Sequence, residues 1–403
     1  MDLSASKYPG GNLVVADIGR DCLVSVVIPV HNEADCLPAA LESFTRQVDV
    51  QKKPLDPSLF EIIIFANNCR DESAAIARRW KNENILLTVH VAEADLPPEN
   101  SNISFVRRLL MNEANARLGR NRHQNGIIMT TDGDTCVAPN WIAANMQEIK
   151  NGADAVGGRI LISPNEIRQM DGKARLFHLL DTGYRLLTAE LEARLDCISH
   201  DCLPRHHQHF NGSFAVTTEA FRRAGGIPEV RFLEDVAFYR SLLRVDARFR
   251  HSPFVRVNTS ARHSGRTESG LSTQISEWTA MGRNSDEYFV ESAAAIERRV
   301  YLRSRLRDLW KRREMIPIVC EMDALADQLF VPESFLRTEL ENLQTFGAML
   351  ENIEREQHRI GGWANTYPLA AIEKTLGDLR RILKIRRRET PTGVQSFAQT
   401  SRR

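Results

Sequence analysis

The sequence predicts an α/β protein with a doubly wound, mostly parallel sheet, flanking helices and a separate C-terminal helical region. Three observations support this fold class. Short apolar runs of strand length alternate with helical patterns through residues 21–150. Polar and acidic residues stand directly after several of these runs. From residue 285 onward the composition becomes charged, leucine-rich and helical in its periodicity.

The strands are predicted from apolar runs bounded by polar segments. Leu23–Val30 is β-branched, which is typical of a buried parallel strand. Phe60–Ala66 has the same character, and Leu86–Ala92 is a weaker example. Gly126–Thr131 is followed at once by an aspartate, and Ala153–Ile162 is expected to form a further strand.

Helices are expected between these strands. Leu37, Leu41 and Phe44 recur at helical spacing after the first strand. Asp71–Trp80 follows the second strand and begins with a residue suited to an N-cap, and Ser104–Leu118 precedes the strand that ends before the aspartate. This β-α-β-α-β order predicts that ligands bind where the strands end.

Composition excludes several function classes. The 403 residues include 53 basic and 52 acidic side chains, a net charge of +1, so no overall attraction to nucleic acid is expected. No apolar run approaches the ~18 residues that would span a bilayer, and no signal peptide is recognised. The seven scattered cysteines are then expected to be reduced thiols in a cytoplasmic protein.

An acidic turn is the strongest local signal. Asp132 and Asp134 flank Gly133 immediately after a buried strand. Two carboxylates this close repel each other, and a divalent cation such as Mg²⁺ or Mn²⁺ relieves the repulsion while binding diphosphate oxygens. The alternative is an ordinary turn, since Asp and Gly are common turn residues.

The order of motifs resembles that of the family 2 glycosyltransferases of bacterial type, which have the Rossmann-like GT-A fold. The segment V-S-V-V-I-P-V-H-N-E at residues 24–33 is similar to the family's V-S-V-V-I-P-x-Y-N-E, with His31 in place of Tyr. The segment N-N-C-R-D-E-S at 67–73 is similar to its D-G-S-T-D-G-T, with Asn67 in place of the first Asp. The resemblance covers residues 22–280 and rests on several ordered motifs rather than one.

The later motifs complete the resemblance. Asp132 and Asp134 match the family's D-x-D element, and Gly212–Gly226 followed by Glu234-Asp235 resembles its acceptor segment. The resemblance implies a nucleotide-sugar-binding subdomain and an acceptor and catalytic subdomain, while composition predicts a flexible tail before them and a helical appendage and a disordered tail after them. In chain order, these parts are expected at 1–20, 21–150, 151–284, 285–390 and 391–403.

The resemblance implies a donor site built on the strand ends. Pro29, His31, Glu33 and Asn67 would line the nucleoside pocket. For Asn67 a loop cap is the alternative, and for His31 an ordinary surface position.

Two basic residues on the expected helix at 104–118 are the remaining donor-site candidates. Arg107 or Arg108 would approach the diphosphate, because a guanidinium can bind phosphate oxygens with two nitrogens at once. Asp132 is expected to belong to the donor site as well as to the metal site. The alternative for these arginines is a solvated helix face.

The resemblance also implies the catalytic and metal residues. Asp235 would be the general base of an inverting transfer, and Glu234 would orient or bind the acceptor. An acidic first turn that favours the helix dipole is compatible with that role. His263 would join Asp132 and Asp134 around Mn²⁺ or Mg²⁺, whereas a structural or surface histidine is the alternative.

A cluster outside the family pattern carries metal-ligating side chains. The cluster has six members within thirteen positions: Cys197, His200, Cys202, His206, His207 and His209. Their spacing fits no common zinc site, so a zinc site and a loop at the acceptor mouth, with His207 or His209 facing the sugar, are both considered.

The C-terminal region carries basic runs at 311–313 and 386–388, the second beside an apolar stripe that includes Leu376, Leu379 and Leu383. Peripheral contact with an anionic membrane is one interpretation. The other is an amphipathic helix packed on its own domain with a solvated basic face.

The sequence therefore predicts an inverting, metal-dependent hexosyltransferase. It would move a sugar from a nucleotide diphosphate donor to a small-molecule, glycan or lipid-linked acceptor, in cell-envelope or glycoconjugate biosynthesis. One alternative is a catalytically degenerate nucleotide-sugar-binding or scaffold protein, against which the intact Asp132, Asp134 and Asp235 argue. A sugar nucleotidyltransferase is the other, and the lack of a glycine-rich loop after the first strand argues against it.

Overall fold

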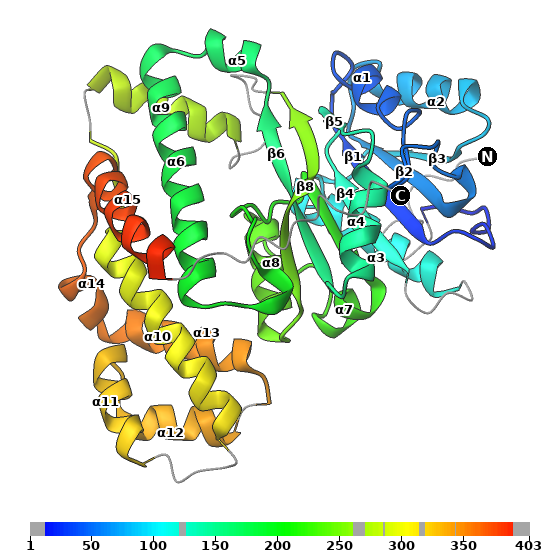
Figure 1. The fold of residues 1–403 in the computed structure, drawn as a ribbon. Helices are drawn as coiled ribbons and strands as arrows, with labels where there is room; N and C mark the ends of the chain where they lie inside the picture. The colour runs from blue at the N-terminus through cyan, green and yellow to red at the C-terminus, as the bar shows by residue number, and fades with distance from the viewer. Residues whose placement is uncertain are drawn as a thin grey trace, which may run out of the picture.

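The computed structural model describes residues 13–120, 126–260, 271–284, 287–313, 319–342 and 344–389. Within these ranges the chain forms an eight-stranded sheet flanked by helices, with C-terminal helices beside it (Figure 1). The strands are β1 (Val24–Val30), β2 (Phe60–Asn67), β3 (Thr88–Ala94), β4 (Ile127–Thr131), β5 (Thr135–Val137), β6 (Ala155–Ile162), β7 (Ser213–Thr217) and β8 (Phe249–Thr259). Their order across the sheet is β3-β2-β1-β4-β7-β6-β8-β5.

The first half of the sheet is parallel. β1 pairs with β2 on one side and with β4 on the other, and β2 pairs with β3, all in parallel. Every residue of β1 and β2 is buried, as their continuous apolar sequences predict. The carboxyl ends of β1, β2 and β4 therefore meet at one edge of the sheet, which is where the site is expected.

The second half of the sheet mixes directions. β7 runs antiparallel to β4 and β6, β6 is parallel to β8, and β5 is antiparallel to β8. The α/β fold with a mostly parallel sheet and flanking helices is thus confirmed, and β6 is the strand expected at 153–162.

Helices cover both faces of the sheet. The six helices concerned are α1 (Leu37–Glu42), α2 (Ser73–Glu83), α3 (Ile103–Gly119), α4 (Trp141–Lys150), α7 (Thr218–Arg223) and α8 (Glu234–Arg244). On one face α1, α2 and α4 contribute Leu41, Trp80 and Trp141 to the core. On the other face α3, α7 and α8 contribute Leu110, Phe221 and Phe238.

The C-terminal helical region expected from the sequence is confirmed, and it packs against the rest of the chain. The long helix α6 (Gly172–Leu195) contacts α9 (Leu271–Asn284), α10 (Ala293–Arg312) and α15 (Ile372–Glu389). Beyond α10 lie α11 (Val319–Leu329), α12 (Glu333–Asn342), α13 (Phe346–Ile360) and α14 (Gly362–Thr366), and together they enclose a separate apolar core (Figure 1). The domain boundaries themselves stay predictions.

The apolar stripe of α15 faces its own domain. Leu376, Leu379 and Leu383 are buried in a core shared with α6 and α10. In the basic run that follows, Arg386 pairs with Glu297 and Arg387 with Glu190. This is the arrangement expected of an amphipathic helix packed on its own domain. No helix in the described part of the chain has the length and apolar character of a membrane span.

Candidate active site

The ends of β1 and β2 are joined by the residues expected to bind the donor. The ring of His31 lies 2.8 Å from the Asn67 carbonyl oxygen, measured from Nδ1. Because a carbonyl can only accept, Nδ1 carries the hydrogen, and Nε2 is then free to accept from the Asn32 amide 3.2 Å away. The side chain of Asn67 is buried, and its amide donates to the Ser101 carbonyl at 3.1 Å. One donor of Asn67 is thus used to hold the segment before α3.

The loop after β1 is tied to the start of α2. The backbone N–H of Glu33 donates to the Ser73 hydroxyl at 2.7 Å, and that of Ala34 donates to the Asp71 carboxylate at 3.0 Å. Asp71 also accepts from the Ser73 N–H, so it caps the first turn of α2 although it lies one residue before the N-cap position. These contacts fix the backbone at Glu33.

The acidic turn lies directly against the end of β1. A Cβ placed on Gly133 would lie 3.2 Å from Cγ of Glu33 and 3.4 Å from the carbonyl oxygen of Pro29. Pro29 itself is buried within β1, behind this turn. Glycine at position 133 thus allows the turn to approach the two expected donor residues closely.

The carboxylate of Asp132 is accessible on one side and held on the other. Its side chain is 40% exposed, while Oδ1 lies 2.7 Å from Nη2 of Arg107. A Cβ on Gly212 would lie 2.9 Å from Oδ2, and the Gly212 carbonyl accepts from the Thr131 hydroxyl at 2.9 Å. The segment at Gly212, which the resemblance assigns to the acceptor side, therefore packs against the donor-side carboxylate.

Asp134 is held by a different pair of strands. Its Oδ1 accepts from the hydroxyl of Thr135 at 3.1 Å and from that of Thr259 at 3.5 Å, and these two threonines are paired between β5 and β8. Asp132 and Asp134 thus offer hard oxygen ligands on one turn, a donor set that fits Mg²⁺ or Mn²⁺. The third expected ligand, His263, lies outside the described residues, and no group of three His, Cys, Asp or Glu side chains suited to a metal occurs within them.

Arg107 and Arg108 take opposite directions from α3. The side chain of Arg107 is buried and reaches the Thr130 hydroxyl at 2.7 Å as well as Asp132. Arg108 pairs with Glu229 at 2.7 Å and lies over the ring of Phe105. Arg107 is therefore the arginine that points into the site, while Arg108 follows the helix surface.

The acidic pair expected to act on the acceptor opens helix α8. Leu233, the residue before it, has a left-handed backbone with φ of 55°, which turns the chain sharply into the helix. Glu234 is buried and lies 3.3 Å from Nε of Arg107 and 3.4 Å from the Ser104 hydroxyl. Both interpretations of this acidic turn are compatible with the structure, since the pair begins a helix and also borders the site.

The surroundings of Asp235 make it a weaker acid than an exposed aspartate. Burial and the neighbouring charge of Glu234 raise its pKa above the ordinary value. The hydrogen bond from the Val236 N–H and the charge of Arg107 lower this pKa, but by less. Its Oδ1 accepts from that N–H at 2.8 Å. A carboxylate with a raised pKa is a stronger proton acceptor than an ordinary exposed aspartate.

Several contact residues of the site carry no motif of their own. Ser104 touches Glu234, the Asn211 carbonyl accepts from Arg107 at 3.3 Å, and Thr259 touches Asp134. Asn211 directly precedes the Gly212 segment, so its place in the sequence could have marked it as a site residue. The other two are common residue types whose partners lie more than 120 positions away, and no local pattern distinguishes them.

The histidine cluster does not assemble a zinc site. His206 lies 3.0 Å from the Ser252 carbonyl and accepts from the Gln208 N–H, while Cys197 and Cys202 are exposed. Within the described ranges, which include every member of this cluster, no metal-binding group is found. Burial lowers the pKa of His206 to about 3 and that of His209 to about 4, so both rings are neutral near pH 7.

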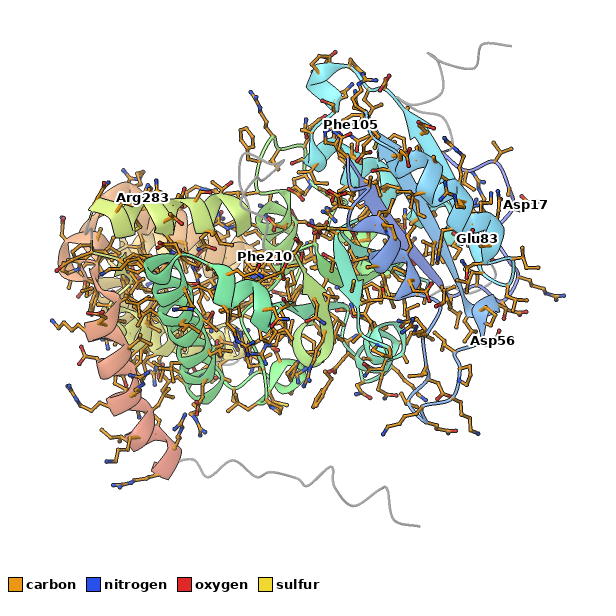
Figure 2. All side chains as sticks on the ribbon, turned by 90° about the horizontal axis from the view of Figure 1, so that it is seen from above. Asp17, Asp56, Glu83, Phe105, Phe210 and Arg283 are labelled. Atoms are coloured by element: carbon orange, nitrogen blue, oxygen red, sulfur yellow. The ribbon has the colours of Figure 1, made fainter. Side chains whose placement is uncertain are left out.

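His209 nevertheless borders the expected acceptor side. Its ring stacks on the ring of Tyr239, with centroids 4.1 Å apart. Tyr239 lies on α8, one helical turn after Asp235. The adjacent Phe210 lies where the helical side of the molecule meets the sheet (Figure 2). A contact between His207 or His209 and a sugar stays a prediction.

Comparisons with known proteins give one family match and several similar solved structures. Residues 25–208 match the family described as "Glycosyl transferase family 2". No curated protein matches the sequence. Among solved structures, the chain is similar to S. aureus TarS 1-349 in complex with UDP-GlcNAc, with 13% identity, a TM-score of 0.42, and coverage of 84% of this chain and 92% of that one.

Two further solved structures are similar to the chain. A mannosyltransferase, PcManGT from Pyrobaculum calidifontis in complex with GDP-Man and Mn²⁺, shares 14% identity at a TM-score of 0.41, covering 92% of this chain and 88% of that one. Glucosyl-3-phosphoglycerate synthase from Mycobacterium tuberculosis, in complex with Mn²⁺, UDP and glucosyl-3-phosphoglycerate, shares 14% identity at a TM-score of 0.35, covering 67% and 85%.

Proposed function

We propose that the chain is an inverting, metal-dependent glycosyltransferase, because its residues 25–208 match glycosyl transferase family 2. It would move a sugar from a nucleotide diphosphate donor to an acceptor hydroxyl. The observation that carries the proposal is a continuous contact between the two halves of the site. Arg107 lies 2.7 Å from Asp132 on the donor side and 3.3 Å from Glu234 on the acceptor side. Donor carboxylate and catalytic pair therefore share one centre.

The donor half is assigned to the ends of β1, β2 and β4. Pro29, His31, Glu33 and Asn67 would border the nucleoside, because the loop after β1 and the end of β2 are held together at His31. Asp132 and Asp134 would hold Mn²⁺ or Mg²⁺, with His263 as the expected third ligand. A bound divalent cation would supply positive charge to the diphosphate leaving group.

The acceptor half is assigned to the start of α8. Asp235 would accept the proton of the acceptor hydroxyl while that oxygen bonds to the anomeric carbon and the nucleoside diphosphate departs with the electrons of the broken bond. The raised pKa of Asp235 suits this task, and attack from the face opposite the leaving group inverts the anomeric centre. Glu234 would hold the first turn of α8 in place.

A donor panel tests the proposal. The purified chain is mixed with UDP-, GDP- and dTDP-sugars and Mn²⁺, and nucleoside diphosphate release is measured with and without a chelator. Release from at least one donor, abolished by the chelator, is the expected result. Tight donor binding with no turnover would favour a degenerate binding protein instead, and release of pyrophosphate from a nucleoside triphosphate and a sugar phosphate would favour a nucleotidyltransferase.

The acceptor and the cellular location are the remaining parts of the proposal. A small-molecule, glycan or lipid-linked acceptor and a cytoplasmic location stay predictions. Peripheral membrane contact through α15 would be electrostatic, because the apolar stripe of this helix is buried. We therefore expect high salt to release any membrane-bound fraction of the protein.

A further inference from the structure

One buried guanidinium connects four separate segments of the site. From α3, the Arg107 side chain reaches Asp132 in the acidic turn, Glu234 at the start of α8, the Thr130 hydroxyl on β4 and the Asn211 carbonyl. Thr130 and Asp132 belong to one segment, so the side chain joins α3 to three other segments that are far apart in the sequence. The Arg107 side chain is thus a physical link between the donor and acceptor halves.

The charge balance around this link is negative. Only 4% of the Arg107 side chain is exposed, so its charge must be compensated by the protein. Burial alone would lower the pKa of Arg107, but the charges of Asp132, Glu234 and Asp235 raise it above the usual value. Three carboxylates therefore act on a single positive charge, which leaves room for a further cation.

The geometry uses the fork of an arginine. Nη2 faces Asp132 and Nε faces Glu234, so two nitrogens of one planar group reach two carboxylates at once. A lysine ammonium has a single nitrogen at the end of a flexible chain and could not make the same bridge. The bridge therefore depends on the side chain's shape as well as its charge.

The same carboxylate is offered to the guanidinium and to a metal. Oδ1 of Asp132 is the atom that Arg107 contacts, and Asp132 is also an expected metal ligand. A positive charge this close opposes the binding of a divalent cation. A cation bound at Asp132 would neutralise its charge and weaken the attraction between Asp132 and the guanidinium. The attraction between the guanidinium and Glu234 would then be the stronger of the two.

We propose that Arg107 is a positioning residue that competes with the divalent cation for Asp132 and thereby couples metal loading to the placement of the Glu234-Asp235 pair. This inference rests on the proposed function. It assigns to Arg107 a role toward the protein's own carboxylates, whereas the sequence resemblance assigned it only to the donor diphosphate.

The test separates charge from shape. Mn²⁺ binding to the nucleotide-free protein is measured by titration calorimetry, together with the affinity for UDP and GDP and kcat with the active donor. Arg107→Gln removes the charge, so it should bind Mn²⁺ about tenfold more tightly, while kcat falls about 10²-fold because the acidic pair loses its anchor. Arg107→Lys keeps the charge, so its Mn²⁺ affinity should stay near that of the unmodified protein while kcat still falls.

Arg117 provides a matched control on the same helix. It is equally buried and pairs with Glu61 at 2.7 Å, outside the site. Arg117→Gln should lower the melting temperature without tightening Mn²⁺ binding. If Arg107→Gln does not fold, Glu234→Gln tests the proposal by itself. Without the charge of Glu234, the guanidinium should interact more strongly with Asp132. Mn²⁺ should then bind several-fold more weakly, although Glu234 is not an expected metal ligand.

The outcomes are distinct. Tighter Mn²⁺ binding with a lower kcat in Arg107→Gln supports the proposal. Unchanged or weaker Mn²⁺ binding in Arg107→Gln, or unchanged Mn²⁺ binding in Glu234→Gln, overturns the coupling but leaves the glycosyltransferase function standing. If the unmodified chain binds neither Mn²⁺ nor any nucleoside diphosphate, the proposed function and this inference fail together.

Discussion

Asp235, the proposed general base, has a pKa above that of an ordinary aspartate. Burial and Glu234 raise its pKa, so its acid form persists to higher pH than in an exposed aspartate. Because only the deprotonated form can accept the acceptor's proton, kcat should decline as pH falls, and the midpoint should lie above the ordinary aspartate value of about 3.9. A pH–rate profile under saturating donor measures that midpoint.

Replacing the proposed base, Asp235, should separate chemistry from binding. Asp235→Asn keeps the shape of the side chain but cannot accept a proton, so kcat should fall by about 10²- to 10⁴-fold. Donor affinity should change little, because the donor is assigned to the strand ends around Asn67. Turnover close to that of the unmodified enzyme would show that Asp235 is not the base, and Glu234→Gln would then be the next variant to measure.

Gly212 tests the close approach of the acceptor segment to Asp132. A methyl group in Gly212→Ala would lie 2.9 Å from Oδ2 of Asp132 and 3.2 Å from Cδ1 of Ile160, so the carboxylate must shift. We expect Mn²⁺ and donor to bind about tenfold more weakly, which is within the usual cost of overpacking. Gly119→Ala is the control, since its added methyl group meets no atom within 4 Å. Equal metal affinity in the two variants would contradict this account.

Sequence reasoning found the residues at strand ends and missed the contacts between them. The Asp132 to Asp134 turn and the His31 position were predictable because a buried strand precedes each one. The bridge at Arg107 was not, since its partners are set by the way α3 packs on the sheet beside β4 and α8. The split between Arg107 and Arg108 depends on which face of α3 is buried, and both residues looked equivalent in the sequence.

At the scale of elements, helix α13 packs against the C-terminal end of α8. Asp246 accepts from the N–H groups of Phe346 and Gly347 at 2.9 and 2.7 Å, which caps the first turn of α13. Arg244 at the end of α8 forms a bidentate pair with Glu351 of α13. The helical region thus holds the end of α8 opposite to Glu234-Asp235.

The closest point of this helix contact is Gly347. A Cβ there would overlap the carbonyl oxygen of Leu243, so Gly347→Ala must push α13 away from α8. We expect a loss of about 1–3 kcal/mol in the free energy of unfolding, measured by denaturant titration. Gly377→Ala, whose methyl group meets no atom within 4 Å, should be neutral or stabilising by up to ~1 kcal/mol. Equal stability of the two variants would argue against close packing of α13 on α8 at Gly347.

Element types were predicted better than element partners. The alternating apolar runs predicted β1, β2, β4 and β6, because burial on both faces leaves a continuous apolar signal. The antiparallel insertion of β7 between β4 and β6 has no local signature, since strand direction depends on the whole chain path. The docking of α13 on α8 likewise depends on contacts across about a hundred residues of sequence.

At the scale of the whole molecule, ion pairs connect the C-terminal helix α10 to the end of the long helix α6. Asp196, at the end of α6, accepts from Arg303 at 2.8 Å and from Arg307 at 3.0 Å, both on α10. Burial alone would raise the pKa of Asp196, but the two arginines lower it below the ordinary value. The expectation of a C-terminal helical region was therefore right about its helices, and the structure shows these joined to α6 through charges as well as through a shared apolar core.

This ion pair should make the stability of the protein depend on pH. A carboxylate whose pKa is lowered by folding contributes stability above its unfolded pKa of about 3.9 and loses it as pH falls through the lower folded value. Asp196→Asn should therefore cost about 1.5–3 kcal/mol near pH 7, and less once the pH falls well below 4. A constant difference between the two proteins from pH 7 to pH 3 would contradict the assignment.

The anomer first released by slow transfer to water tests the central claim most directly, because it requires no knowledge of the acceptor. The purified chain is incubated with Mn²⁺ and the α-linked nucleotide sugar that gives turnover, and the free sugar is followed by proton NMR before it mutarotates. The account predicts that the β-anomer appears first, that a chelator prevents its release, and that Asp235→Asn slows it by about 10²-fold or more. First appearance of the α-anomer, or full release in excess chelator, would contradict an inverting, metal-dependent transfer.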